Sequence, residues 1–515
     1  MNTTTAITTI NSWQRVSPIA LLYFLVKFIK GLVSNFVYLL PALYVSYNHI
    51  VKNPTLWLPI VLAVLCLIFI LVFLKYYFFK FRIYNNNLEI RSGVFAKKHI
   101  NLPFERIQNI KLEQPIFYRP FNVVCLLLDT AGSHKQEANI VALNLHDAEQ
   151  LKKVILTNHQ KSTLNNATKN STTPCNKPEL AQERILNTRA LFDLILHGLS
   201  NNRVWIFLGG LAPFFDEIAE YVTQWLLSLG INIEQILMFN DKPWWQIGFY
   251  AFTLTLIILV PISLLSILGA VLSFYNFTLS KIGDRYIRRS GLLTKQEVTM
   301  KLSRLQMVIR QQDWLDRLFK RMNVRFEQNQ SLENKLNTSA YANKIIVPSV
   351  TEKQCQALID DAYPDNQLQQ ITFKAISKRY LLRNIGYILL PLYLLLAGFL
   401  YINDKTLLLA LISPLFAFFT LVIYLRWRRW GYAYDNNYFY LRSGAIGIAI
   451  KIFPLYKVQQ SQYKQSIFLR KHQLCHVRLV LASGSVVIPY IMQQDGYCLI
   501  DNILYIVEET PRSWM

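Results

Sequence analysis

The sequence predicts a membrane protein of three repeats, each a two-helix transmembrane hairpin followed by a small α+β domain. Three observations lead to this fold class. One spaced motif occurs three times, long uncharged segments come in pairs, and each pair precedes one copy of the motif. Hydrophobic residues make up 52% of the chain and charged residues 17%, which is below the usual quarter of soluble proteins.

The repeated motif begins with Arg-Ser-Gly and ends with an arginine. In every copy a glutamine lies 15 residues after the glycine, a basic residue lies two before that glutamine, and an arginine lies 11 after it. Glycine, basic residue, glutamine and arginine are Gly93, Arg106, Gln108 and Arg119, then Gly291, Arg304, Gln306 and Arg317, then Gly444, Lys457, Gln459 and Arg470. Ungapped spacing over this length, three times, indicates an internal repeat.

Local patterns predict antiparallel strands in each copy. Phe79, Phe81 and Ile83 alternate with polar residues, and an asparagine-rich turn follows at 85–87, which is typical of a half-buried hairpin. Each copy ends in an apolar strand and an amphipathic helix, at 140–143 and 147–156, 345–347 and 352–360, and 486–488 and 495–507. Strands closed by one C-terminal helix predict a small sheet or barrel domain.

These pieces resemble the bacterial pleckstrin-homology (PH) domains of YdbS/YdbT-like membrane proteins. The second copy departs from the others, with Lys301 in place of Pro103 and Pro454, and with no counterpart of Thr130-Ala131-Gly132. The resemblance implies a PH-like small β-barrel or sheet domain with a C-terminal helix. It also implies a role in envelope maintenance or resistance to membrane-active peptides, beside a smaller one-domain family partner.

The repeats divide the chain into alternating segments. Hairpins are expected at 16–74, 184–274 and 370–425, PH-like domains at 75–160, 275–362 and 426–512, and a linker at 161–183, after a disordered start over residues 1–15. Six spans are expected at 31–47, 56–74, 204–215, 246–272, 385–402 and 406–425, with an interfacial helix at 19–30. Basic residues at 75–82, 374–383 and 426–429 predict an inner-membrane protein whose domains and termini are cytoplasmic.

The net charge of +23 indicates an anionic partner. Beside uncharged spans, phospholipid head groups are favoured over nucleic acid, and the positive-inside rule alone is the alternative. The run Arg426-Trp427-Arg428-Arg429-Trp430 fits the head-group region, either as an anchor or as a site that recognises one lipid. A homo-oligomer is a further candidate assembly.

The basic residue and glutamine of each motif have two interpretations. In the first interpretation, these side chains contact phosphate or a neighbouring chain. The residues are Arg106, Arg304 and Lys457, with Gln108, Gln306 and Gln459. In the second they are structural and satisfy loop carbonyl groups.

The sequence favours a non-enzymatic role in binding or assembly. It contains no nucleotide-binding loop or hydrolase elbow, so no catalytic residue and no cofactor is expected. His472 and His476 have the spacing of one helical turn but lack a third ligand, and Asp313 and Asp316 suggest a solvated salt-bridge face. The alternatives are a lipid or solute transporter, for which Asp216, Glu217 and Glu220 are the nearest acidic candidates, and a protein scaffold that does not bind lipid.

Overall fold

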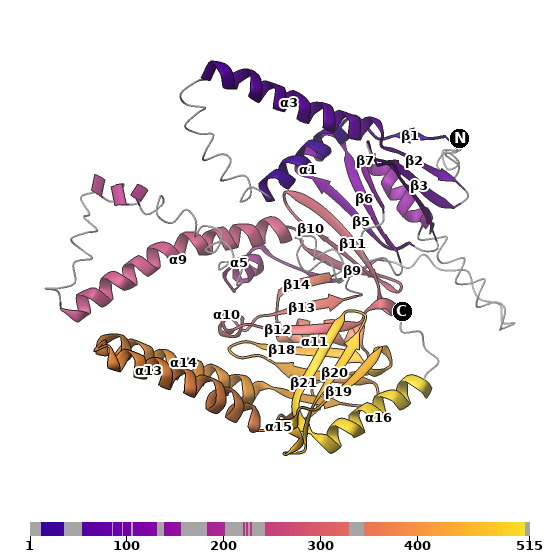
Figure 1. The fold of residues 1–515 in the computed structure, drawn as a ribbon. Helices are drawn as coiled ribbons and strands as arrows, with labels where there is room; N and C mark the ends of the chain where they lie inside the picture. The colour runs from indigo at the N-terminus through magenta and orange to yellow at the C-terminus, as the bar shows by residue number, and fades with distance from the viewer. Residues whose placement is uncertain are drawn as a thin grey trace.

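The computed structural model arranges three repeats in a row, from indigo through magenta to yellow in Figure 1. It describes residues 12–34, 54–84, 86–94, 96–104, 107–130, 138–155, 183–200, 243–328 and 344–509, with short helical pieces between 220 and 228. Helices α3, α9, α13 and α14 project from the same side of the row of domains (Figure 1). The helices that precede each domain therefore point in the same general direction.

Each domain contains a four-stranded and a three-stranded antiparallel half. In domain 1 the first half is β1 (Gln14–Arg15), β2 (Lys80–Tyr84), β3 (Asn87–Ser92) and β4 (Lys98–Pro103). The second half is β5 (Ile107–Pro115), β6 (Val123–Thr130) and β7 (Ala138–Asn144), with the short helix η2 (Ile116–Phe121) between β5 and β6. A helix over residues 145–155 closes the domain. The predicted hairpins and terminal helix are present here.

Domain 2 repeats this order. Its strands are β8 (Arg184–Thr188), β9 (Thr278–Ile282), β10 (Arg285–Ser290), β11 (Thr294–Lys301), β12 (Met307–Gln312), β13 (Met322–Glu327) and β14 (Lys344–Val350). Its helical elements are η4 (Leu302–Arg304), α10 (Trp314–Leu318) and α11 (Glu352–Ala362).

Domain 3 follows the same order. Its strands are β15 (Lys374–Ala375), β16 (Gly431–Tyr434), β17 (Tyr438–Ser443), β18 (Ile448–Pro454), β19 (Gln460–Lys464), β20 (Leu474–Leu481) and β21 (Gly484–Met492). Its helical elements are η7 (Leu455–Lys457), α15 (Ile467–Arg470) and α16 (Gln493–Glu509).

The first strand of every domain lies before its hairpin in the sequence. Gln14 pairs with Phe81, Arg184 pairs with Lys281, and Lys374 pairs with Tyr432. The expectation of a disordered start over residues 1–15 is therefore wrong for Gln14 and Arg15. Their strand is too short to show a period-two pattern, so only its pairing with β2 reveals it.

The halves of neighbouring domains merge into larger sheets. One seven-stranded sheet has the order β7-β6-β5-β11-β10-β9-β8, and a second has β14-β13-β12-β18-β17-β16-β15. The second half of each domain thus continues into the first half of the next. Sheets β1-β2-β3-β4 and β19-β20-β21 remain separate at the two ends of the row.

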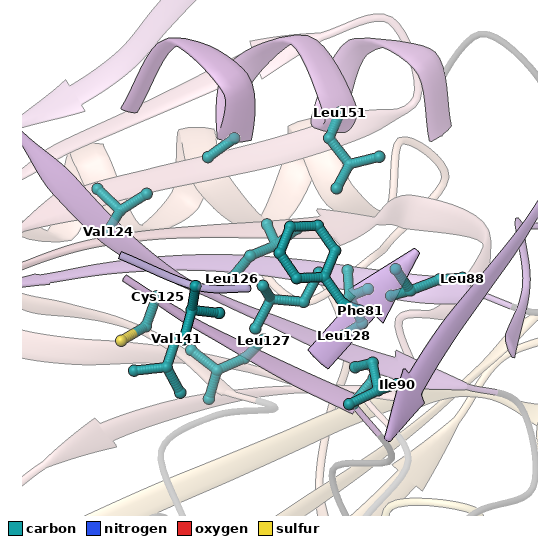
Figure 2. Packing of buried hydrophobic residues seen from close by; sticks show 14 of the residues in the cluster. Phe81, Leu88, Ile90, Val124, Cys125, Leu126, Leu127, Leu128, Val141 and Leu151 are labelled. Atoms are coloured by element: carbon teal, nitrogen blue, oxygen red, sulfur yellow. The ribbon is translucent and has the colours of Figure 1, made fainter. Parts of the chain in front are cut away.

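The core of domain 1 lies between its two halves and the terminal helix. Figure 2 shows Leu151 of that helix pointing toward Phe81 of β2 and Leu126 of β6. Leu126 and Leu88 are fully buried, and a buried leucine contributes roughly 1.5–3 kcal/mol to folding. The buried core of domain 1 includes Val16, which precedes α3, and the core of domain 2 includes Leu194, which precedes α9. Packing of these side chains anchors the hairpins to their domains.

The third hairpin is described along its whole length. It consists of α12 (Arg379–Leu381), the π-helical turns η6 (Leu382–Leu389), α13 (Leu390–Ile402) and α14 (Thr406–Arg429). Within the described parts of the chain, Arg379–Ile402 and Leu408–Arg429 are the two helices long and apolar enough to cross a membrane. Tyr393 stacks on Phe416 with 4.4 Å between ring centroids, which joins the two helices.

The first two hairpins are described only in part. α1 (Ala20–Ser34) packs against α3 (Pro54–Tyr77), and α5 (Leu191–Ser200) packs against α9 (Trp244–Phe274). Most of the expected span 31–47 and all of 204–215 lie outside the described residues, as do Asp216 and Glu217, which follow the second of these spans. Three complete hairpins therefore remain an expectation, and one is seen.

Candidate functional site

The Arg-Ser-Gly of the motif forms the turn that ends β3, β10 and β17. Gly291 has φ +114° and Gly444 has φ +145°, a region that side chains disfavour. A Cβ atom at Gly291 would lie 2.1 Å from the Thr294 carbonyl oxygen, and one at Gly444 would lie 2.0 Å from that of Gly447. Only glycine fits this turn, which explains why it recurs in every copy.

The arginine of Arg-Ser-Gly holds the segment that precedes the first strand of its own domain. Arg91 lies over Trp13 at 4.0 Å, and Arg442 lies over Phe373 at 4.8 Å. Arg289 makes an ion pair with Glu183 instead. The three partners each stand one residue before β1, β8 or β15. This role was missed in the sequence, because the partners differ in chemistry and lie far away in the chain.

Lys457 lies inside the junction between domains 2 and 3. Its side chain is 2% exposed, and Nζ donates to the carbonyl oxygens of Ser303 at 2.7 Å and Leu305 at 2.6 Å. Burial lowers the pKa of Lys457 to about 8, while Asp284 opposes this shift. These contacts are those of the structural interpretation, in which the basic residue satisfies loop carbonyl groups.

The other motif residues occupy different environments. Burial, with Arg285 nearby, lowers the pKa of Arg304 to about 10. Gln306 is buried at the start of β12, whereas the Gln459 side chain is exposed and its backbone N–H donates to Val480 O at 2.8 Å. Arg106 lies outside the described residues, as does the side chain of Gln108 in β5. The two glutamines whose side chains are described, Gln306 and Gln459, therefore do not share one kind of environment.

The two domain junctions use the same strand register. Val298, seven residues after Gly291, pairs with Lys111, three residues after Gln108. Lys451, seven residues after Gly444, pairs with Ile309, three residues after Gln306. Tyr363 of domain 2 also contacts Tyr438 of domain 3, with ring centroids 5.0 Å apart. The two junctions therefore share one docking mode between consecutive domains.

The arginine-tryptophan run at the end of α14 divides into two kinds of residue. Arg429 donates from Nη1 to the carbonyl oxygens of Ala445 at 2.6 Å and Gly447 at 3.4 Å, so it supports the Arg-Ser-Gly turn. Arg426 and Arg428 are exposed at the base of the hairpin, with Arg426 5.3 Å from the Trp430 ring. These two arginines therefore do not share the role of Arg429 in the turn.

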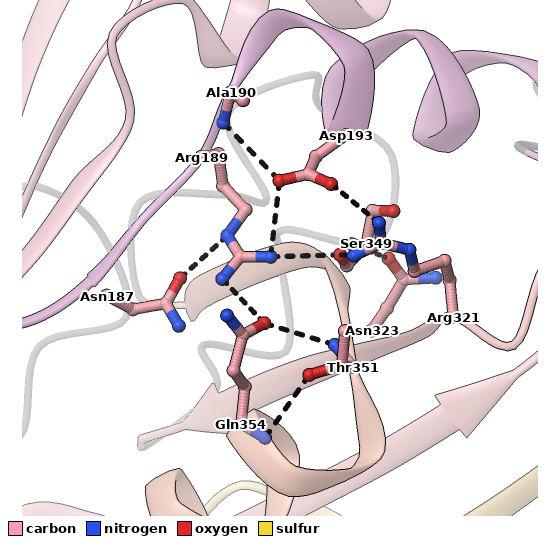
Figure 3. A network of polar contacts seen from close by, with 9 residues as sticks. All are labelled: Asn187, Arg189, Ala190, Asp193, Arg321, Asn323, Ser349, Thr351 and Gln354. Carbon is pink, nitrogen blue, oxygen red and sulfur yellow. Dashed lines mark hydrogen bonds and ion pairs between the residues drawn. The ribbon is translucent and has the colours of Figure 1, made fainter.

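A buried arginine fixes the second hairpin to its domain (Figure 3). Arg189 donates to Asn187 Oδ1 at 2.7 Å, to Ser349 O at 3.0 Å and to Gln354 Oε1 at 2.9 Å. Asp193 of α5 is 3.6 Å from Arg189 and pairs with Arg321 at 3.1 Å. Burial lowers the pKa of Arg189. No motif distinguishes this arginine in the sequence, because its partners come from distant elements.

The two histidines are not on one helix. His472 follows α15, whereas His476 belongs to β20 and accepts a hydrogen bond from Tyr490 N at 3.1 Å. Their helical spacing therefore has no structural counterpart. Among the residues that the structure describes, no group of three His, Cys, Asp or Glu side chains could hold a metal ion.

A row of two-sheet domains with exposed apolar hairpins on one side defines a membrane-associated protein of repeated PH-like domains. The bacterial PH domain family matches residues 32–159, 229–360 and 380–504, and the chain belongs to this family. It is 21% identical over 486 residues to the transmembrane protein YdbT of Bacillus subtilis (strain 168), covering 92% of this chain and 93% of that relative. No solved structure matches. The resemblance predicted from the motif is confirmed.

Proposed function

We propose that this chain is a non-enzymatic, multi-pass membrane scaffold whose domains dock edge to edge and accept further copies of the chain. The common register of the two internal junctions carries the proposal. Strand pairing at a sheet edge satisfies backbone groups and is a known mode of recognition. A docking mode used twice within one chain can also be used between chains.

Both halves of a further junction are present at the ends of the row. In the described chain, β4 of domain 1 has β3 as its ladder neighbour, and β19 of domain 3 has β20. β4 corresponds to β11 and β18, which form the first-half edges of the two internal junctions. β19 corresponds to β5 and β12, which form the second-half edges. A head-to-tail contact of this kind leaves one docking edge unused at each end, so copies can be added until a ring closes.

The side chains of the end strands suit a reversible contact. β19 carries Gln460, Ser461 and Gln462 where β12 buries Met307 and Val308. Affinity would therefore come from backbone hydrogen bonds more than from apolar burial. Because the hairpins project from one side of the row, an extended row keeps them in one membrane (Figure 1).

The proposal places the domains against an anionic cytoplasmic leaflet. The chain carries +23, and Arg426 and Arg428 are exposed at the base of the third hairpin. Each basic residue near such a leaflet contributes about 1 kcal/mol. A row of anchored domains also suits the envelope maintenance that the family resemblance implies.

Cysteine cross-linking between two copies tests the assembly. The shared register pairs Ile100 of one copy with Gln462 of the next. Full-length Ile100→Cys and Gln462→Cys chains are expressed together and oxidised in native membranes. We expect disulfide-linked dimers only from the mixture, because paired strands bring Cα atoms within disulfide reach.

Each variant alone and the unsubstituted chain, which keeps its own cysteines, serve as controls. A symmetric contact would cross-link a single variant with itself. Equal dimer yields from a single variant, or no dimer from the mixture, would contradict head-to-tail docking.

A further inference from the structure

We infer that a short helical turn in every domain inserts apolar side chains into the bilayer interface. The three turns are η2, α10 and α15, named here the interface turns. Each begins eight residues after the motif glutamine, with Ile116, Trp314 and Ile467. These first side chains are 53%, 55% and 80% exposed, although each is large and apolar.

Each interface turn has a second exposed apolar side chain. These are Phe121, Leu318 and Phe468, of which Phe468 is 83% exposed. A single exposed apolar residue is common on a soluble surface, but two such side chains on the same turn of all three repeats are not. Such recurrent patches mark binding surfaces for protein or membrane.

The interface turns lie against the hairpins. Tyr118 of η2 is 6.3 Å from Tyr23 of α1, between ring centroids. α10 packs against α5. Leu469 of α15 belongs to the same buried cluster as Tyr380, with Trp427 of α14 packed against it. α10 and α15 appear on the side from which the hairpins project (Figure 1). The bilayer that receives the hairpins is therefore the nearest occupant for these side chains.

The polar side of the second interface turn, α10, is fixed by hydrogen bonds to its own domain. Asp316 is 1% exposed and accepts a hydrogen bond from Asn323 Nδ2 at 2.9 Å, while Asp313 caps the helix. The expectation of a solvated Asp313–Asp316 face is wrong for Asp316, because its carboxylate faces inward. With this polar side fixed, Trp314 and Leu318 are directed outward.

The composition of the turns favours lipid over a protein partner. The motif arginine lies three residues after the start of each turn, and Arg317 and Arg470 are exposed. Aromatic and aliphatic side chains beside arginine are typical of the head-group region. On α5, which packs against α10, Leu191 and Phe192 are exposed as well. The occupant is therefore a lipid bilayer, and the inference rests on the hairpins lying in it.

Quenching by nitroxide-labelled lipids tests the insertion. The full chain is reconstituted in vesicles of phosphatidylcholine and phosphatidylglycerol, with one fluorescent label on Phe468→Cys. The matched control is native Cys498, exposed on α16 away from the hairpins, and the positive control is native Cys66, exposed on α3. In each sample the other reactive cysteines are replaced by alanine.

We expect shallow nitroxides to remove about half of the fluorescence at position 468 and almost none at Cys498, because interfacial side chains sit at head-group depth. Ile116→Cys and Leu318→Cys should behave like Phe468→Cys. If position 468 responds like Cys498 while deep nitroxides quench Cys66, the turns do not touch lipid. Failure at Cys66 itself would reject the hairpin placement, and the inference with it. Quenching at 468 alone would reject the claim for three repeats.

Discussion

At the scale of single residues, the motif lysine acts inside the protein. Lys457 donates to two carbonyl groups of domain 2 and has almost no exposure. A phosphate cannot reach an ammonium group that is already surrounded by protein. The same motif position can therefore serve docking between domains without any ligand.

Lys457→Ala should destabilise the chain. The substitution leaves the Ser303 and Leu305 carbonyl groups without their donor, and such a loss costs about 1–3 kcal/mol. Lys464→Ala, at an exposed position of β19, should change stability by at most about 0.5 kcal/mol. Thermal unfolding of the detergent-solubilised chain at about pH 10, where the Lys457 amine is largely neutral and the penalty for its buried charge is absent, is followed by circular dichroism and compares the two. Equal Tm values would contradict the contact.

The junction lysine should also give a pH dependence. The pKa of Lys457 is about 8 in the folded chain and 10.5 when free, so the unfolded state binds more protons between these values. Stability therefore rises as pH increases from about 8 to about 10.5, and the penalty for the buried charge is fully present below pH 8. Wild type should gain Tm over this range relative to Lys457→Met, in which other groups titrate alike. A constant difference would show that the lysine titrates normally.

At the scale of elements, close helix packing sets the geometry of the second hairpin. A Cβ atom at Gly198 of α5 would lie 2.5 Å from the Ile267 Cα atom of α9. The Ser266 hydroxyl donates to Gly198 O at 2.7 Å across the same contact. The two helices approach this closely because one of them presents no side chain.

Gly198→Ala should weaken that contact. The added methyl group forces α5 away from α9, and overpacking of this kind costs about 1–3 kcal/mol. Gly269→Ala in α9 is the matched control, since no atom lies within 4 Å of its Cβ position and alanine favours helix by about 0.5–1 kcal/mol. Thermal unfolding should show a lower Tm for the first variant and an unchanged or higher Tm for the second. A lower Tm for Gly269→Ala alone would refute the packing argument.

Substitutions of the arginines at the end of α14 should have two different effects on Tm. Arg429→Ala removes the donor to Ala445 and Gly447 and should lower Tm by the equivalent of about 1 kcal/mol. Arg426→Ala with Arg428→Ala should leave Tm in neutral detergent unchanged, since both side chains are exposed. The double variant should instead lose part of the Tm gained when phosphatidylglycerol is added. An undiminished lipid gain would remove these residues from the head-group contact.

At the scale of the whole molecule, all three domains should lie on one side of the membrane. Figure 1 shows the hairpin helices on a single side of the row, and the basic residues at 75–82, 374–383 and 426–429 favour the cytoplasm for the domains. Reporters fused after Gln160, Asp361 and Met515 should therefore report the cytoplasm, and one inserted at Asp404 the outside. A periplasmic signal from any domain would overturn the architecture.

Periodic and spaced patterns determined much of this protein from the sequence alone. The glycine-to-glutamine spacing identified three domains, and alternation at Phe81 and Ile83 located strands that the structure contains. These features are local, because a strand or a tight turn depends on neighbours a few residues away. The apolar runs at 385–402 and 406–425 were recognisable for the same reason.

The tertiary structure alone decided how the domains connect and what the motif side chains contact. β5 pairs with β11 and β12 with β18, although nothing in the sequence distinguishes these sheet edges from other edges. Lys457 is buried by a neighbouring domain, and Arg91, Arg289 and Arg442 hold segments that precede the hairpins. Such contacts join residues far apart in the chain, where spacing carries no information about which surfaces meet in space.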